Sequence, residues 1–226
     1  MARLARVVIP GYPHHVTQRG NGRARTFFED GDYALYRDLL AANCKAAEVE
    51  VWAWCLMPNH VHLILVPSDP DGLRRALARV HRSYAGVIQA RRKRTGHSWQ
   101  GRFGAVAMDE EHLAAALRYV SLNPVRARLV PRAQDWRWSS TRAHLRGKDD
   151  GLTALAPVRD RFPEFSDLLA TEPEADLFGA LRSAESIGRP LGDSRFLARI
   201  ERQTGRILKP AKRGPKPAVE EDGKNI

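Results

Sequence analysis

From residue 49 to residue 66 the chain runs Val-Glu-Val-Trp-Ala-Trp-Cys-Leu-Met-Pro-Asn-His-Val-His-Leu-Ile-Leu-Val. Both halves of this stretch are rich in β-branched and aromatic side chains, which are enriched in β-strands. Only Pro58 and Asn59 separate the two halves, and a two-residue connection between strands is typical of a β-hairpin. We therefore predict two antiparallel strands, one over residues 49–57 and one over residues 60–66.

Strand-like and helix-like segments alternate on both sides of this hairpin. They are a strand over 14–19, a helix capped by Asp30 or Asp32 that runs to Cys44, a basic helix from Leu73 that ends before Thr95, a strand over 101–108, and a helix that Asp109 caps and Pro124 stops. The order is β-α-β-β-α-β followed by a helix. It predicts an α+β protein with a ferredoxin-like, split βαβ antiparallel sheet and helices on one face.

The pattern weakens after about residue 150. We expect helical pieces between residues 162 and 181 and a short amphipathic helix over residues 193–204. Residues 206–217 carry five Lys or Arg side chains among Pro and Gly and no acid, which predicts a tail that is disordered alone and attracted to DNA. The chain is thus divided into a main domain over 1–150, a helical extension over 151–205, and a basic tail over 206–226.

The composition excludes several classes of protein. The chain has 226 residues with an apolar share of 43%, which excludes wholesale disorder. No apolar run approaches the roughly 20 residues of a membrane helix, and we expect neither a membrane partner nor a signal peptide. The two cysteines, Cys44 and Cys55, exclude a disulfide scaffold and a Cys-rich zinc module, so a reducing cytoplasm is expected.

Positive charge is concentrated in two zones of the sequence. Lys and Arg number 37 against 26 Asp and Glu, which gives a net charge of +11. No acid occurs from Leu73 to Met108, and only Asp135 occurs between Arg118 and Arg146. Arginine predominates in both zones and suits bidentate contact with phosphate. A solvated helix face is the alternative, but unpaired like charges repel one another, so a nucleic acid is the favoured partner.

Two histidines in the predicted hairpin form a candidate metal site. Side chains alternate along a strand, so His60 and His62 project to the same face, where two imidazoles can chelate one divalent cation. A structural, hydrogen-bonded histidine pair is the alternative. Tyr119 and Asn123 share a helix face at positions i and i+4, and a tyrosine beside a metal is a plausible nucleophile towards phosphorus. The alternatives are an ordinary buried or surface tyrosine and, for Asn123, a helix C-cap before Pro124.

Four separated motifs carry a resemblance to a known family. They are His60-Val61-His62 after the Met-Pro-Asn turn, Tyr119 followed by Leu122-Asn123-Pro124-Val125-Arg126-Ala127, the segment His15-Val16-Thr17-Gln18-Arg19-Gly20-Asn21, and Trp99-Gln100-Gly101-Arg102-Phe103. The four motifs fall along the chain in the order expected for one family. From about residue 10 to 145 the chain resembles the REP-associated tyrosine transposases. These proteins belong to the HUH superfamily and are related to the transposases of small insertion sequences.

The resemblance implies an HUH catalytic domain over 1–150 that cleaves single-stranded DNA at hairpin repeats and leaves a 5′-phosphotyrosine and a free 3′-hydroxyl. His60 and His62 would be metal ligands, Tyr119 the nucleophile, and Asn123 the third ligand unless water fills that place. Mg²⁺ is the implied cofactor and Mn²⁺ the expected substitute. The implied location is the cytoplasm, associated with the nucleoid. A monomer or a homodimer is expected, in which Tyr119 serves its own histidines or those of its partner.

The residues expected to contact DNA are polar or basic side chains in these motifs and in the two basic zones. They are Gln18, Arg19, Arg74, Arg75, Arg79, Arg82, Arg102, Arg118 and Arg126. Two other functions stay open at this point. One is a module that binds hairpin DNA without cutting it, and the other is a metal-dependent hydrolase in which water replaces Tyr119 as the nucleophile. A replication initiator or relaxase is less favoured, because no further histidine ligand or second tyrosine is found.

Overall fold

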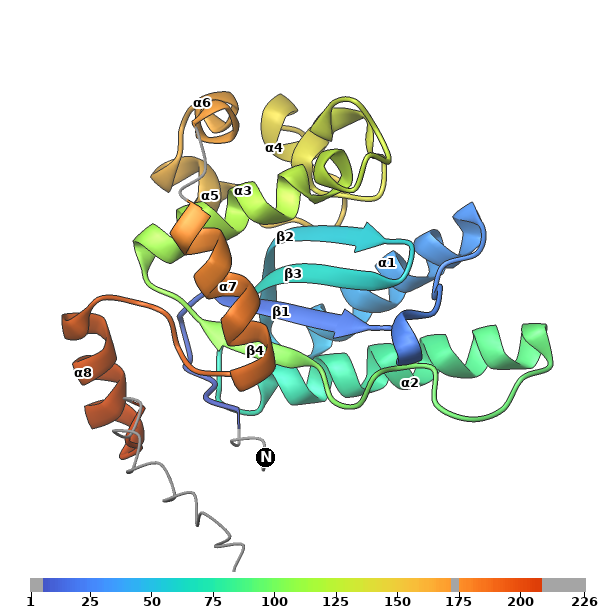
Figure 1. Cartoon of the computed structure of the whole chain (residues 1–226), viewed down its shortest axis with the longest axis horizontal. Helices are drawn as coiled ribbons and strands as arrows, with labels where there is room; N and C mark the ends of the chain where they lie inside the picture. Colours follow the sequence, from blue (N-terminus) through green and yellow to red (C-terminus); the bar gives the residue numbers. More distant parts are fainter. Residues whose placement is uncertain (1–5, 172–174, 209–226) are drawn as a thin grey trace, which may run out of the picture.

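An antiparallel sheet of four strands lies at the centre of the molecule (Figure 1). The computed structural model describes residues 6–171 and 175–208. The strands are β1 (His14–Arg19), β2 (Val49–Met57), β3 (His60–Pro67) and β4 (Gly104–Ala107), in the spatial order β2-β3-β1-β4. This is the order of a split βαβ, ferredoxin-like sheet, and it confirms the predicted α+β class.

The β2–β3 hairpin has the predicted form, since Met57 pairs with His60 across the turn. Strand β1 lies on the other side of β3, where Arg19 is opposite His60 and Thr17 is opposite His62. Because residues directly opposite each other share a face of the sheet, the side chains of His15 and Thr17 lie on the same face as those of both histidines of β3.

The two faces of the sheet pack against different helices (Figure 1). Helices α1 (Asp30–Ala46) and α2 (Gly72–Arg92) cover one face, where Val61, Leu63 and Leu65 point into the core. The sequence predicts helices on one face of the sheet, and α1 and α2 have this arrangement. Helices α3 (Glu110–Arg126) and α7 (Ala175–Ile187) pack on the opposite face, the one that carries His60 and His62.

Helix α3 differs from its prediction at one end. Its N-terminus is as expected, because the Asp109 carboxylate accepts a hydrogen bond from the His112 backbone N–H at 3.0 Å. Its C-terminus is not at Pro124, since the helix continues to Arg126. Proline removes a single N–H donor, and the Ala127 N–H closes the last turn on the Asn123 carbonyl at 2.9 Å. Asn123 is therefore an interior helical residue, and its interpretation as a C-cap is wrong.

Two other boundaries differ from the sequence prediction. Helix α1 begins at Asp30, but Glu29 is its N-cap and forms a reciprocal capping box with Asp32. Strand β4 begins at Gly104 rather than at residue 101, because the preceding residues form a loop that bonds to β1 through the Gln100 N–H and the Arg19 carbonyl at 2.8 Å.

The extension after residue 150 is helical, as predicted, and packs against the main domain. Its helices, together with the short helix that precedes it, are α4 (Thr141–Arg146), α5 (Leu155–Arg161), α6 (Phe165–Ala170), α7 and α8 (Ser194–Thr204). Val158, Phe165 and Leu181 join the core that α3 forms with the sheet. Leu191 pairs with the outer edge of the sheet through its N–H and the Ala107 carbonyl at 2.8 Å. The predicted basic tail lies outside the described residues from Lys209 onward.

Among the described residues, no helix has the length and apolar character needed to cross a membrane.

Two buried histidines away from the site predict a loss of stability in mild acid. His14 accepts a hydrogen bond from the Ile9 N–H and donates one to the Tyr12 carbonyl, and His81 bonds to the Tyr36 hydroxyl. Burial lowers the pKa of His14 to about 4 and that of His81 to about 3. The unfolded chain takes up these protons near pH 6.5, so stability is full above that pH and falls as the pH drops towards 4.

At pH 5 we expect each of these histidines to lower the free energy of unfolding by about 2 kcal/mol relative to pH 7.5. Guanidinium unfolding followed by tryptophan fluorescence at the two pH values measures the effect. Equal unfolding midpoints at pH 7.5 and pH 5 would contradict the prediction.

Candidate active site

Side chains from three separate elements meet on the α3 face of the sheet. The His60 and His62 rings of β3 are neighbours, with centroids 4.8 Å apart. The Tyr119 ring of α3 lies against them, with its centroid 5.3 Å from that of His62 and 5.9 Å from that of His15 on β1. The structure therefore brings the predicted nucleophile and the predicted metal ligands together within a single chain.

Hydrogen bonds fix the orientation of both imidazoles of β3. His62 Nδ1 lies 3.0 Å from His15 Nε2, and the two rings are stacked with centroids 5.2 Å apart. His60 Nδ1 lies 2.6 Å from the Asn59 side-chain oxygen. Metal-binding histidines are commonly held through one ring nitrogen while the other binds the cation. With both Nδ1 atoms engaged, Nε2 of each ring is the atom suited to bind a cation.

All three histidines are neutral at physiological pH. Burial lowers the pKa of His60 to about 3, with a further contribution from the Arg19 charge, and it lowers the pKa of His15 to about 4. Burial also lowers the pKa of His62 well below its ordinary value, and the neighbouring imidazoles and arginines add to the shift. Coordination of a metal ion requires the neutral imidazole, so this state is the competent one.

Tyr119 is held by aromatic and cationic contacts on its other side. Its ring is 7% exposed and packs edge-on against Phe178 of α7, with centroids 5.3 Å apart. The Arg126 guanidinium lies over both rings, 4.8 Å from the Tyr119 centroid and 5.1 Å from the Phe178 centroid. These contacts fix the plane of the phenol and place a positive charge beside it.

Asn123 lies one helical turn beyond Tyr119 on the same face of α3. Its side-chain nitrogen is buried and has no hydrogen-bond partner among the described residues. An amide can turn about its last bond to present its oxygen instead, and oxygen is the ligand type that Mg²⁺ prefers. The donor set of two imidazoles and one amide oxygen is thus compatible with a divalent cation whose coordination is completed by phosphate and water. No cluster of three or more His, Cys, Asp or Glu side chains able to hold a metal occurs in the described ranges.

The residues predicted to contact DNA are divided between the two faces of the sheet. Arg19 and Arg126 lie beside the histidines and Tyr119, and both contribute to the lowered pKa of His62. Arg118, the neighbour of Tyr119, is 7% exposed, and its Nε has no partner in the described part of the chain. Gln18 is buried on the other face, because it is opposite Val61, and its amide donates to the Gly101 carbonyl at 3.2 Å.

The basic residues of α2 do not reach the histidines, because α2 covers the opposite face of the sheet. Two of them are also paired with acids just before the acid-free zone: Arg74 with Asp71 at 2.5 Å and Arg75 with Asp69 at 2.5 Å. The remaining candidates Arg79, Arg82 and Arg102 are exposed. Their roles in DNA binding stay predictions.

Two residues of the site escaped the sequence analysis as members of it. The sequence presents His15 only as part of a family motif. Thr17 is opposite His62, and His15 is two residues before Thr17, so its side chain lies on the same face as the histidines of β3. Only the register of β1 against β3 reveals this. Phe178 lies in the extension and has no motif of its own. Its contact with Tyr119 depends on the packing of α7 against α3.

The comparisons with known proteins agree with this geometry. The sequence profile of the family described as "Transposase IS200 like" matches residues 11–123, which is half of the chain. The chain belongs to this family. The matched region contains β1, the hairpin histidines and the segment of α3 that carries Tyr119 and Asn123.

Two proteins that are similar to this chain have descriptions more specific than the family's. A Haemophilus influenzae protein named "Putative REP-associated tyrosine transposase" is 26% identical over 116 residues, which span 46% of this chain and 66% of that protein. A solved structure of a REP-associated tyrosine transposase bound to a REP hairpin superposes with a TM-score of 0.57 at 21% identity, covering 68% of this chain and 92% of the other. At this identity the superposition supports the shared fold, including the four-stranded sheet. The resemblance drawn from the sequence motifs is confirmed.

Proposed function

We propose that this protein is an endonuclease and strand transferase for single-stranded DNA that acts at hairpin-forming repeats through a 5′-phosphotyrosine intermediate. The observation that supports the proposal most is the contact of the Tyr119 ring with His62, beside His60, in a family of transposases. A tyrosine held against two neutral imidazoles on a face rich in arginine has the parts that nucleophilic attack on a phosphodiester needs.

The proposed cleavage exchanges one phosphoester bond for another. The Tyr119 oxygen attacks the phosphorus, and the bond from phosphorus to the 3′-oxygen breaks. The phenol loses its proton, and the departing 3′-oxygen gains one and leaves as a hydroxyl. The downstream fragment stays linked to the tyrosine through its 5′-phosphate, and the upstream fragment ends in a free 3′-hydroxyl. Attack by the 3′-hydroxyl of another strand reverses the exchange and restores the tyrosine. Since the ester bond is conserved, strand joining requires no nucleotide hydrolysis.

His60 and His62 would hold the divalent cation through Nε2, with Asn123 or water as a further ligand. Mg²⁺ is the proposed ion and Mn²⁺ the proposed substitute. When bound, such a cation neutralises charge on the phosphate oxygens and polarises the phosphorus. The chain itself orients the imidazoles through His15 and Asn59, and it places the Arg126 charge next to the phenol.

A DNA hairpin as the substrate is supported by the solved relative, which was determined with a REP hairpin. The net charge of +11 and the arginines beside the site favour the same partner. In this structure Tyr119 faces the histidines of its own chain, and that arrangement supports cleavage by a single protomer. Monomer or homodimer, and a location with the nucleoid in the cytoplasm, stay predictions.

Incubation of the protein with 5′-unlabelled, 3′-labelled single-stranded repeat DNA and Mg²⁺ tests the proposal directly. The labelled fragment is expected to migrate with the protein on a denaturing gel, because the 5′-phosphate of the downstream, 3′-labelled fragment becomes tyrosine-linked. Tight binding with no protein-linked band would support the alternative of a non-catalytic hairpin-binding protein. Cleavage without linkage would point to a hydrolase that uses water.

Deletion of residues 209–226 is expected to weaken DNA binding and reduce its salt dependence. The deletion spares Leu208, which is buried in a cluster with Phe196 and Ile200. It removes the basic cluster Lys209, Lys212, Arg213 and Lys216, together with Lys224 and the three acids Glu220, Glu221 and Asp222. For a single strand the slope of log affinity against log salt should fall by about 2 to 3. Fluorescence anisotropy from 50 to 300 mM NaCl measures the slope, and an unchanged value would show that this segment does not contact DNA.

A further inference from the structure

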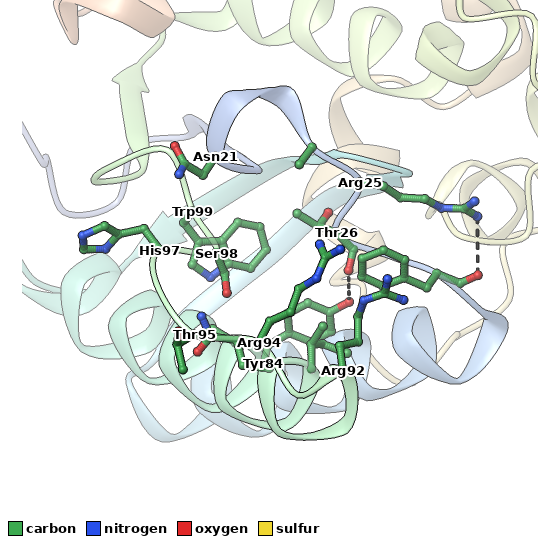
Figure 2. A pocket seen from close by; sticks show the side chains of 15 residues that line it. Asn21, Arg25, Thr26, Tyr84, Arg92, Arg94, Thr95, His97, Ser98 and Trp99 are labelled. Atoms are coloured by element: carbon green, nitrogen blue, oxygen red, sulfur yellow. Dashed lines mark hydrogen bonds between the residues drawn. The ribbon is translucent and has the colours of Figure 1, made fainter.

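A cavity of 260 Å³ lies on the opposite side of the sheet from the histidines, between the segment after β1 and the loop after α2 (Figure 2). Backbone hydrogen bonds join its two walls: the Asn21 N–H donates to the Ser98 carbonyl at 3.0 Å, and Gly20 pairs with Trp99. Because both walls are tied to the end of β1, the shape of the cavity is set by the fold rather than by independent loops.

Aromatic rings form one side of this cavity (Figure 2). The Tyr84 hydroxyl donates to the Thr26 carbonyl at 2.8 Å, and the Trp99 indole N–H donates to the His81 carbonyl at 3.0 Å. Their ring centroids are 5.8 Å apart. Tyr84 is only 2% exposed, whereas Trp99 is partly exposed, so the Trp99 ring is the aromatic surface left to contact a ligand. Such surfaces stack on flat aromatic heterocycles.

The rest of the lining is cationic. Arg25, Arg92 and Arg94 are among the lining residues, and no carboxylate is. In the described ranges no acid lies within ion-pair distance of Arg92 or Arg94, whereas the neighbouring Arg91 is paired with Glu29 and Asp32. The Arg92 guanidinium stacks over the Phe28 ring, 3.8 Å from its centroid, and has no acid of the described residues beside it. An aromatic surface beside guanidinium groups that lack an acid partner is complementary to a flat base attached to a phosphate.

We propose that this cavity binds one unpaired nucleotide of the single strand, with its base on Trp99 and its phosphates on Arg92 and Arg94. Its volume lies just below the roughly 300–1,000 Å³ of pockets for drug-sized ligands, which suits one nucleotide. A paired, stacked base of a duplex cannot enter it. The inference rests on the proposed function, because it takes single-stranded DNA as the substrate.

The position of the cavity fits a strand that also reaches the active site. Strand β1 carries His15 beside His62, and Arg19 is opposite His60 at its end. Asn21, which lines the cavity, is two residues further on, about 7 Å along an extended backbone. The same end of β1 therefore leads to both places, and one strand of DNA can pass around it from the cavity to the catalytic tyrosine.

The test uses a 20-nucleotide oligothymidylate that contains 5-iododeoxyuridine, bound to the Tyr119→Phe variant so that cleavage does not interfere. Ala85 lines the cavity from α2, and Ala85→Phe should fill it. Ala90→Phe makes the same change on the exposed side of the same helix, outside the cavity lining. Ultraviolet crosslinking with mass spectrometry locates the base, and anisotropy measures affinity.

We expect crosslinks at Trp99 when the cavity is unaltered, and a loss of at least about fivefold in both crosslink yield and affinity for Ala85→Phe. Ala90→Phe should match the parent protein, and binding to a 20-base-pair duplex should not respond to either change. Crosslinks elsewhere, or equal binding by the two variants, would overturn the inference.

A second variant tests the cavity independently, in case Ala85→Phe does not fold. Arg94→Ala changes an exposed side chain, and it should lower the crosslink yield and reduce the salt slope by about 0.7, the value for one phosphate contact on a single strand. Arg159→Ala makes the same change at an exposed position of α5 that does not line the cavity, and it should leave the crosslink yield unchanged. If the wild-type protein forms the tyrosine-linked product while these variants have no effect, the cavity proposal alone fails. If no single-strand preference and no linked product exist, the proposed function fails.

Discussion

Replacement of Tyr119 by phenylalanine is expected to lower the rate of single-strand cleavage by about 1000-fold or more and to abolish the protein-linked DNA product. The substitution removes only the hydroxyl oxygen. The ring contacts with His62 and Phe178 and the position of the Arg126 guanidinium can all be kept. Affinity for the DNA should therefore change by less than about threefold, because the lost atom acts in bond formation rather than in binding.

Tyr33→Phe is the matched control, since it removes the same atom from a tyrosine that stacks on Phe27 and Trp138 in the α1 core. It should cleave at the parental rate. The measurements are the initial rate of cleavage and the amount of linked product on a denaturing gel. Undiminished cleavage by Tyr119→Phe, with the linked product still present, would refute the covalent mechanism.

The half of the site on the hairpin was predictable from local rules. The alternation of side chains in a strand puts His60 and His62 on one face whatever the rest of the chain does, and the spacing of Tyr119 and Asn123 puts both on one side of a helix. These relations depend on residues within four positions of each other. The structure shows both relations as the sequence predicts them.

The other half of the site depends on packing between distant segments. The hydrogen bond between His15 and His62 follows from the register of β1 against β3, and the sequence does not contain that register in any local pattern. The contact of Phe178 with Tyr119 follows from the docking of the extension on α3. A one-residue change of strand register would send His15 to the opposite face, so this part needs the folded structure.

The ion pairs of the arginines were also predicted less well than the positions of the helices and strands. The acid-free zone from residue 73 to 108 suggests unpaired arginines, but Asp69 and Asp71 lie just before it and pair with Arg75 and Arg74 at the start of α2. These two pairs are local, but Arg91 pairs with Glu29 and Asp32 of a distant segment, and a count along the sequence cannot find that contact. In the described ranges Arg79, Arg82, Arg92 and Arg94 have no acid within ion-pair distance, and the last two line the proposed nucleotide cavity.

Removal of one imidazole or of the cation is expected to have the second largest effect. His60→Ala should lower the cleavage rate by about 100-fold or more at 1 mM Mg²⁺, and chelation with EDTA should lower the wild-type rate to a similar level. His60 is the safer substitution, because it lies at the start of β3 and is only half-buried, whereas His62 is buried in the sheet.

His15 should show an intermediate effect that separates ligands from the residue that orients them. His15→Ala leaves both imidazoles of β3 in place but removes the partner of His62 Nδ1, so the Mg²⁺ concentration for half-maximal rate should rise about 10-fold or more while the rate at saturating Mg²⁺ is largely recovered. His15→Gln can again accept a hydrogen bond from that nitrogen and should restore most of the apparent affinity. His60→Ala should not recover at high Mg²⁺, because a ligand itself is missing. A wild-type protein that cuts at full rate in EDTA, or a His60→Ala variant that matches it, would show that the histidines have a structural role alone.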